Sequence, residues 1–202
     1  MKTRMTAYVV GVLLAGCAAT TPTRETSVGY VIYDIQAGPQ TSAAKIAEAI
    51  KLALQKNTSR VQITNGIPLS PLPEKAPRFQ LVSPLKGSNL GALAAASGQS
   101  LQVPTCDGAT LTVNARDSSM SRYGEATTFF ACLMPYQGGY SLNIYTTFTK
   151  ASGAINAATL GATIMRPFVG DSAQFIPRTI GQIVEGVQQT GATVKLVEAY
   201  PS

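Results

Sequence analysis

The residues that could perform chemistry are few in this chain of 202 residues, because it contains no histidine. Without imidazole, a Ser-His-Asp or Cys-His catalytic set is excluded, and so is any histidine-ligated metal. No Gly-x-Ser-x-Gly elbow, phosphate-binding glycine loop or calcium-binding acidic loop occurs. Asp107 and Glu125 could form a carboxylate pair if the strands around them adjoin, although two solvated turn carboxylates explain them more simply. We therefore expect a protein that is not an enzyme and binds no cofactor or metal.

Two groups of polar residues could instead contact a ligand or a partner. Arg116 and Arg122 flank a turn beside Tyr123, which could contact an anion or a glycan, or could cap a hairpin with solvated charge. Near Gly138 and Gly139 lie three tyrosines, a residue type enriched at protein interfaces. We name them as possible partner contacts, with ordinary exposed strand tyrosines as the alternative: Tyr136, Tyr140 and Tyr145.

The first seventeen residues have the layout of a secretory signal. Lys2 and Arg4 precede an apolar run over 7–15, which as a helix covers about 14 Å and is too short to span a bilayer. The run ends in Leu14-Ala15-Gly16-Cys17, which resembles the lipobox of bacterial lipoproteins. The alternative is an ordinary signal peptide with an incidental cysteine.

The lipobox resemblance implies cleavage before Cys17 and acylation of that cysteine, including a palmitate-type chain. Several acyl chains hold a protein on a membrane where one does not. In Gram-negative lipoproteins an Asp after the cysteine favours the inner membrane, whereas here Ala18 and Ala19 follow. For a Gram-negative source, the resemblance therefore implies a lipid anchor on the periplasmic face of the outer membrane.

Once Cys17 is lipidated, Cys106 and Cys132 remain as an even pair in an oxidising compartment. A redox-active pair usually has the spacing Cys-x-x-Cys, which these two lack. We expect a structural disulfide. The 16 Lys and Arg against 10 Asp and Glu give a charge of only +6, which does not indicate a nucleic-acid partner.

Hydrophobic periodicity predicts the elements that position these residues. Residues 28–35 are apolar on both faces and predict a central strand; a helix follows over 41–57, and a strand over 60–67 is expected to return beside the first. In the proline-rich stretch 68–99 we expect one strand-like run, 78–82, and a short helix, 90–97. Residues 101–150 predict an antiparallel meander, followed by a helix over 171–192, with Pro177 in its first turn, and a strand over 193–200.

These elements predict an α+β fold with a mostly antiparallel sheet, two main helices packed on one face and the order β-α-β-(β)n-α-β. The expected organisation is a signal peptide over 1–16, a lipidated flexible tether over 17–27 and a single domain over 28–202. We expect an outer-membrane-anchored lipoprotein that is a non-enzymatic structural or accessory component of a cell-envelope assembly, with an envelope protein as partner. The alternative is a stand-alone periplasmic binding, inhibitor or immunity lipoprotein.

Overall fold

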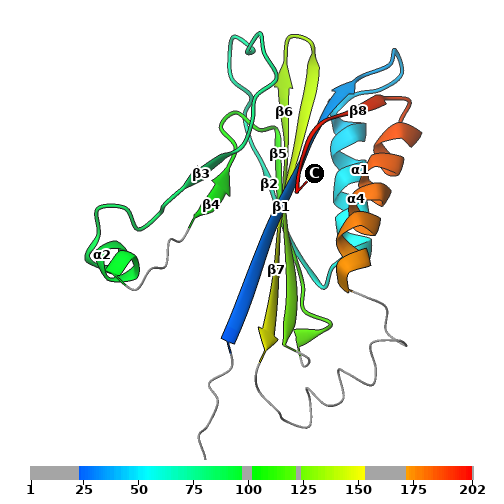
Figure 1. The fold of residues 1–202 in the computed structure, drawn as a ribbon. Helices are drawn as coiled ribbons and strands as arrows, with labels where there is room; N and C mark the ends of the chain where they lie inside the picture. The colour runs from blue at the N-terminus through cyan, green and yellow to red at the C-terminus, as the bar shows by residue number, and fades with distance from the viewer. Residues whose placement is uncertain (1–22, 97–101, 122–123, 153–171, 202) are drawn as a thin grey trace, which may run out of the picture.

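The computed structural model describes residues 23–96, 102–121, 124–152 and 172–201, which form a mixed α/β fold. A six-stranded antiparallel sheet dominates it, in the order β2-β5-β6-β7-β1-β8, beside a two-stranded sheet of β3 and β4 (Figure 1). The strands are β1 (Thr23–Gln36), β2 (Arg60–Asn65), β3 (Gln80–Val82), β4 (Val103–Thr105), β5 (Leu111–Asp117), β6 (Glu125–Tyr136), β7 (Gly139–Ser152) and β8 (Thr193–Tyr200). The helices are α1 (Ala43–Asn57), α2 (Asn89–Ala96) and α4 (Ser172–Gln189).

The core lies between the sheet and the pair α1 and α4, which Figure 1 shows side by side on one face. Ser42 begins α1 because its hydroxyl accepts a hydrogen bond from the Lys45 amide at 3.3 Å. Apolar residues then recur at helical spacing and are fully buried against alternate residues of β5, β6 and β7: Ile46, Ile50 and Leu54 from α1, and Ile183 and Val187 from α4. Each such side chain contributes about 1.5–3 kcal/mol on burial. The mostly antiparallel sheet is thus confirmed, whereas two main helices match only roughly, because three are present among the described residues.

The position of β2 differs from the prediction. The expected neighbour was β1, but β2 pairs with β5 at the opposite edge of the sheet. The hairpin-connected strands β5, β6 and β7 lie between them. Val61 and Ile63 pack against the core there, and the same alternating pattern would bury them at either edge. Local periodicity therefore identifies the strand without identifying its neighbour.

The other face of the sheet is partly covered by the proline-rich segment. The predicted strand and short helix are present as β3 and α2, and β3 pairs with β4, a strand that the sequence pattern does not indicate. Phe79 fastens this cover: its amide donates to the Asn143 side chain at 3.0 Å, and its ring packs edge-on against Tyr30 and Tyr145. The cover therefore contacts the neighbouring strands β1 and β7.

Two predicted boundaries move. Pro177 lies inside α4, which is already helical at Ser172, rather than in its first turn. The predicted tether reached residue 27, but β1 begins at Thr23, and its first five residues pair with β7 from Phe148 to Ser152. The signal segment, the lipobox and Cys17 lie outside the described residues, as do Arg122 and Tyr123.

The predicted disulfide between Cys106 and Cys132 is confirmed, with the two Cα atoms 6.5 Å apart. It joins the residue that follows β4 to the middle of β6, so the proline-rich cover is covalently fixed to the sheet at this point. Cys132 is fully buried beside Met134 on the face away from α1 and α4.

Removing this disulfide should lower the free energy of unfolding by about 3.5 kcal/mol, because the cross-link closes a loop of 26 residues in the unfolded chain. Urea unfolding of the wild type and of the double variant Cys106→Ser/Cys132→Ser measures this. Equal midpoints and slopes for the two proteins would contradict a stabilising role.

Candidate functional site

A groove of about 670 Å³ opens between α4 and the sheet, on the face that the helices cover. Its lining comes from β1, β7, α4 and the end of β8: Ser27, Val28, Gly29, Tyr30, Val31, Tyr33, Thr146, Phe148, Ile176, Pro177, Ile180, Gly181, Tyr200 and Pro201. These side chains are predominantly aliphatic or aromatic, and none carries a charge. The groove can therefore take an apolar ligand or an apolar side chain of a partner.

The groove lies beside the part of the sheet where β1 extends beyond the end of β8. β8 pairs with β1 from Tyr30 to Gln36, whereas the described residues provide no second neighbour for Thr23–Gly29, which pair with β7 alone. β8 ends at Tyr200, whose carbonyl oxygen would lie 3.0 Å from a Cβ at Gly29. A larger residue at 29 would therefore force the two chains apart at this point.

This arrangement leaves the outer backbone groups of Thr23–Gly29 along an open sheet edge. Such an edge is a template on which another extended chain can pair. The exposed apolar surface continues beyond it, since Leu196, Val197 and Tyr200 of β8 are 52%, 60% and 54% exposed. An edge of this kind beside an apolar groove is typical of a surface that binds an extended peptide.

Gly181 of α4 is the open point in the wall of the groove. A Cβ at this position meets no heavy atom within 4 Å. Gly186, one and a half turns further along, is different, because a Cβ there would lie 3.7 Å from Ala49 of α1. A substitution at Gly181 therefore tests the groove, whereas a substitution at Gly186 tests the packing of α4 on α1.

We expect Gly181→Ala to raise the free energy of unfolding by about 0.8 kcal/mol, since glycine within a helix is less favourable than alanine. Gly181→Leu should fold normally and project into the groove. Gly186→Leu should destabilise by about 1–3 kcal/mol, because the longer side chain presses on α1. Thermal and urea unfolding of the three variants test this, and equal destabilisation by both leucines would contradict an open groove at Gly181.

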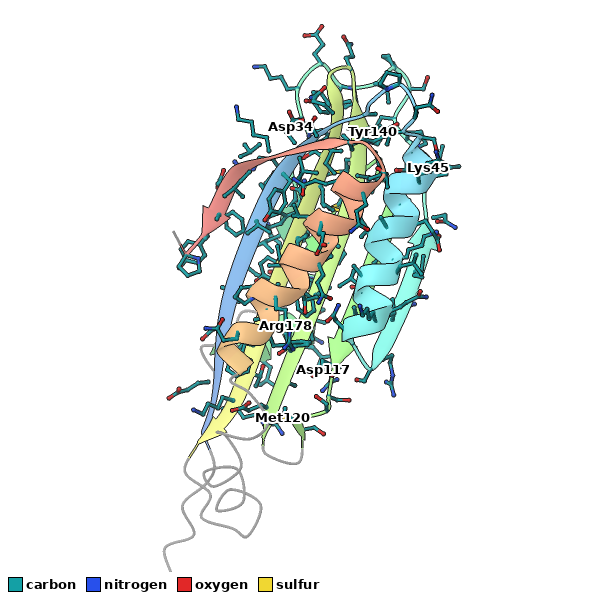
Figure 2. The ribbon with its side chains drawn as sticks, turned by 90° about the vertical axis from the view of Figure 1, so that its right-hand side faces the viewer. Asp34, Lys45, Asp117, Met120, Tyr140 and Arg178 are labelled. Atoms are coloured by element: carbon teal, nitrogen blue, oxygen red, sulfur yellow. A yellow bond between two sulfur atoms is a disulfide. The ribbon has the colours of Figure 1, made fainter. Side chains whose placement is uncertain are left out.

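The three predicted partner-contact tyrosines do not share one surface. Tyr145 is only 8% exposed and packs against Phe79 on the face away from α1 and α4. Tyr140 packs against the main core on the opposite face. Tyr136 donates its hydroxyl to Asp34 at 2.7 Å, and this hydrogen bond is the main cause that raises the pKa of Tyr136. Tyr140 and Asp34 lie near the same end of the sheet in Figure 2.

The candidate carboxylate pair is not formed. Asp107 directly follows Cys106, which is bonded to Cys132, while Glu125 begins β6 seven residues before Cys132. Seven strand residues extend over about 23 Å, so these carboxylates lie too far apart to act together. Within the described ranges, no three His, Cys, Asp or Glu residues gather as metal ligands. Of the predicted arginine turn, Arg116 lines a second cavity on the face opposite the groove.

A polar clamp holds the proline-rich cover against the end of β8. Glu198 accepts hydrogen bonds from the Arg78 guanidinium at 2.8 Å and from the Tyr30 hydroxyl at 2.6 Å. The hydrogen bond from Arg78 is the main cause that lowers the pKa of Glu198, and the bond from Tyr30 lowers it further. The hydrogen bond to the Glu198 carboxylate in turn raises the pKa of Tyr30. Sequence reasoning missed this clamp because its members come from three distant segments.

Because the folded-state pKa of Glu198 is lowered, its contribution is complete above its ordinary pKa of about 4.3 and is lost as pH falls through the folded value. The amide of Phe79 adjoins Arg78. We expect this amide to exchange with solvent a few-fold faster at pH values below the folded-state pKa of Glu198 than at neutral pH, after correction for the intrinsic exchange rate. Glu198→Gln should show the faster exchange at every pH. Hydrogen exchange followed by NMR measures this, with Glu185→Gln on α4 as control, and wild-type exchange in Glu198→Gln would contradict the clamp.

Comparison of the sequence with models of protein families finds no match, and a comparison with curated proteins finds none either. In the part of the chain that the structure describes, no helix is long and apolar enough to cross a membrane.

Proposed function

We propose that this protein is an outer-membrane-anchored lipoprotein that acts as a non-enzymatic accessory component of a cell-envelope assembly, and that it binds an extended, apolar segment of a partner protein at the edge of β1. The observation that carries this proposal is the stretch Thr23–Gly29, which pairs with β7 on one side, has no strand on its other side among the described residues, and runs beside the apolar groove. Backbone pairing along the edge would supply affinity, and an apolar side chain in the groove would supply specificity.

The lipobox supports anchoring at the outer membrane. The short distance between Cys17 and β1 supports the edge of β1 as the surface that binds a partner. β1 begins six residues after Cys17, because 23 − 17 = 6. Six residues extend over at most about 21 Å. A lipid on Cys17 would therefore keep the open edge of β1 close to the membrane surface, where the segments of membrane-embedded partners emerge.

Cell fractionation tests the anchor. In a Gram-negative host the wild type should fractionate with the outer membrane, while Cys17→Ser should appear in the periplasm or as an uncleaved precursor. A processed, membrane-bound Cys17→Ser protein would contradict lipidation at this residue.

Affinity capture from mildly solubilised membranes tests the docking surface. Since Tyr200 and Pro201 line the groove, the tag is inserted beside the exposed Lys75 rather than at the C-terminus. We expect one envelope protein in stoichiometric amount with the wild type and with Gly181→Ala, and its loss with Gly181→Leu. Equal capture of the partner by all three proteins would show that the partner does not bind at the groove.

A solitary wild-type protein would favour the second candidate, a stand-alone binding lipoprotein. The volume and apolar lining of the groove would then indicate a small apolar ligand. A fatty acid such as decanoate should raise the melting temperature of the wild type and of Gly181→Ala, but not that of Gly181→Leu.

A further inference from the structure

The face of the sheet opposite α1 and α4 carries a second cavity of about 400 Å³, with a chemistry unlike that of the groove. Its floor is formed by alternate residues of neighbouring strands: Arg60 and Gln62 of β2, Asn114 and Arg116 of β5, Thr128 and Phe130 of β6, and Tyr145 and Thr147 of β7. Val103 and Pro104 of β4 form a wall. With Gln102, which also lines the cavity, two cations, three side-chain amides and the hydroxyls of two threonines thus surround an aromatic patch.

The two arginines lie directly opposite each other, since Arg60 is the register partner of Arg116. Their side chains share a face, because the neighbouring residues Val61 and Ala115 pack into the core on the other side. Like charges at opposed strand positions are unfavourable. Both side chains are exposed, so solvent screens part of this repulsion, and a negative group between the two guanidinium groups would replace it with attraction.

Hydrogen bonds at the end of the β2–β5 ladder hold this register. The Ser59 hydroxyl donates to the carbonyl oxygen of Arg116 at 3.0 Å and accepts from the Ser118 amide at 3.0 Å. The next pair on the same face of the sheet, Gln62 and Asn114, places two side-chain amides beside the two arginines. The arginines therefore cannot move apart by a slip of the strands.

The cavity contains no negative group of its own. None of its lining residues is acidic. Asp117 adjoins Arg116 but alternates to the other face, and its carboxylate accepts a hydrogen bond from the Ser119 hydroxyl at 2.7 Å. Among the described residues, the ion pairs join Lys51 to Glu48 and Arg78 to Glu198, and neither involves Arg60 or Arg116.

We infer that this cavity binds a sugar that carries an oxyanion, with the carboxylate or phosphate held between Arg60 and Arg116. Paired guanidinium groups match the oxygens of such an anion with charge-assisted hydrogen bonds. Gln62, Asn114, Thr128 and Thr147 provide the donors and acceptors that ring hydroxyls require. Phe130, which is half-buried, offers apolar ring surface to a sugar face. This inference depends neither on the lipid anchor nor on the groove, which lies on the other face of the sheet.

Calorimetric titration of the full-length protein in a neutral detergent, at low ionic strength, tests the inference. The probes are N-acetylmuramic acid, a glucosamine disaccharide bisphosphate, and the neutral disaccharide N,N′-diacetylchitobiose. We expect at least one acidic sugar to bind, more weakly as potassium chloride is added, and the neutral sugar to bind at least tenfold more weakly. Tight binding of the carboxylated sugar would indicate a cell-wall glycan, and that of the bisphosphate a lipid headgroup.

The double variant Arg60→Gln/Arg116→Gln should lose at least tenfold in affinity for the acidic sugar, while Arg60→Lys/Arg116→Lys should retain part of it. The double variant Lys45→Gln/Lys56→Gln removes the same charge from exposed positions of α1 and should bind like the wild type. Without ligand, the Arg116→Gln variant should have a melting temperature equal to or above that of the wild type. This control would show that the arginine variants lose affinity without losing their fold. The absence of binding by either acidic sugar, or undiminished binding by the double glutamine variant, would overturn the inference.

Discussion

The two-residue alternation of β6 and β7 is the constraint on which the rest of this structure depends. Phe129, Ala131 and Leu133 project from β6 toward α1 and α4, whereas the residues between them project toward the proline-rich cover. These strands are therefore buried on both faces and need two different coverings. Two amphipathic helices cover one face, and a short sheet fixed by a disulfide covers the other.

Neither covering extends over its whole face of the sheet, and each face has a cavity where the covering ends. The two cavities differ in the chemistry of their lining residues. On the helical face, the end of β8 leaves the first half of β1 open and exposes an apolar groove. On the other face, β3 and β4 leave the outer strands β2 and β5 uncovered, where paired arginines and amides line the second cavity. The two cavities lie on opposite faces of one sheet, so a partner at the first leaves the second accessible.

Sequence patterns predict the elements of this fold better than their arrangement. The helix ending at Asn57, the strand ending at Tyr200 and the cysteine pair follow from periodicity, turn residues and cysteine count. The neighbour of β2 does not, because its alternating residues suit either edge of the sheet. The short strand β4 was missed because three residues with a central proline carry no periodic signal.

The sites were harder to predict because their members converge from distant segments. Val28–Ile35 has apolar residues on both faces, which indicated a central strand, yet Val28 is 45% exposed and belongs to the groove wall. Arg116 was singled out beside a turn, but the described residue that lies opposite it in β2 is Arg60, which the sequence analysis did not single out. Strand register, which a single sequence does not reveal, decides both cases.

The position of β1 within the sheet has a consequence for how the chain assembles. Among the described strands β1 is the first in the sequence, yet its neighbours β7 and β8 are the last two, and Thr23 lies opposite Ser152. Contacts between such distant segments form slowly, because a long loop must close before they contribute. The six-stranded sheet cannot be completed until β7 and β8 have been synthesised, and a truncation that removes β8 removes a direct neighbour of β1 rather than a peripheral element.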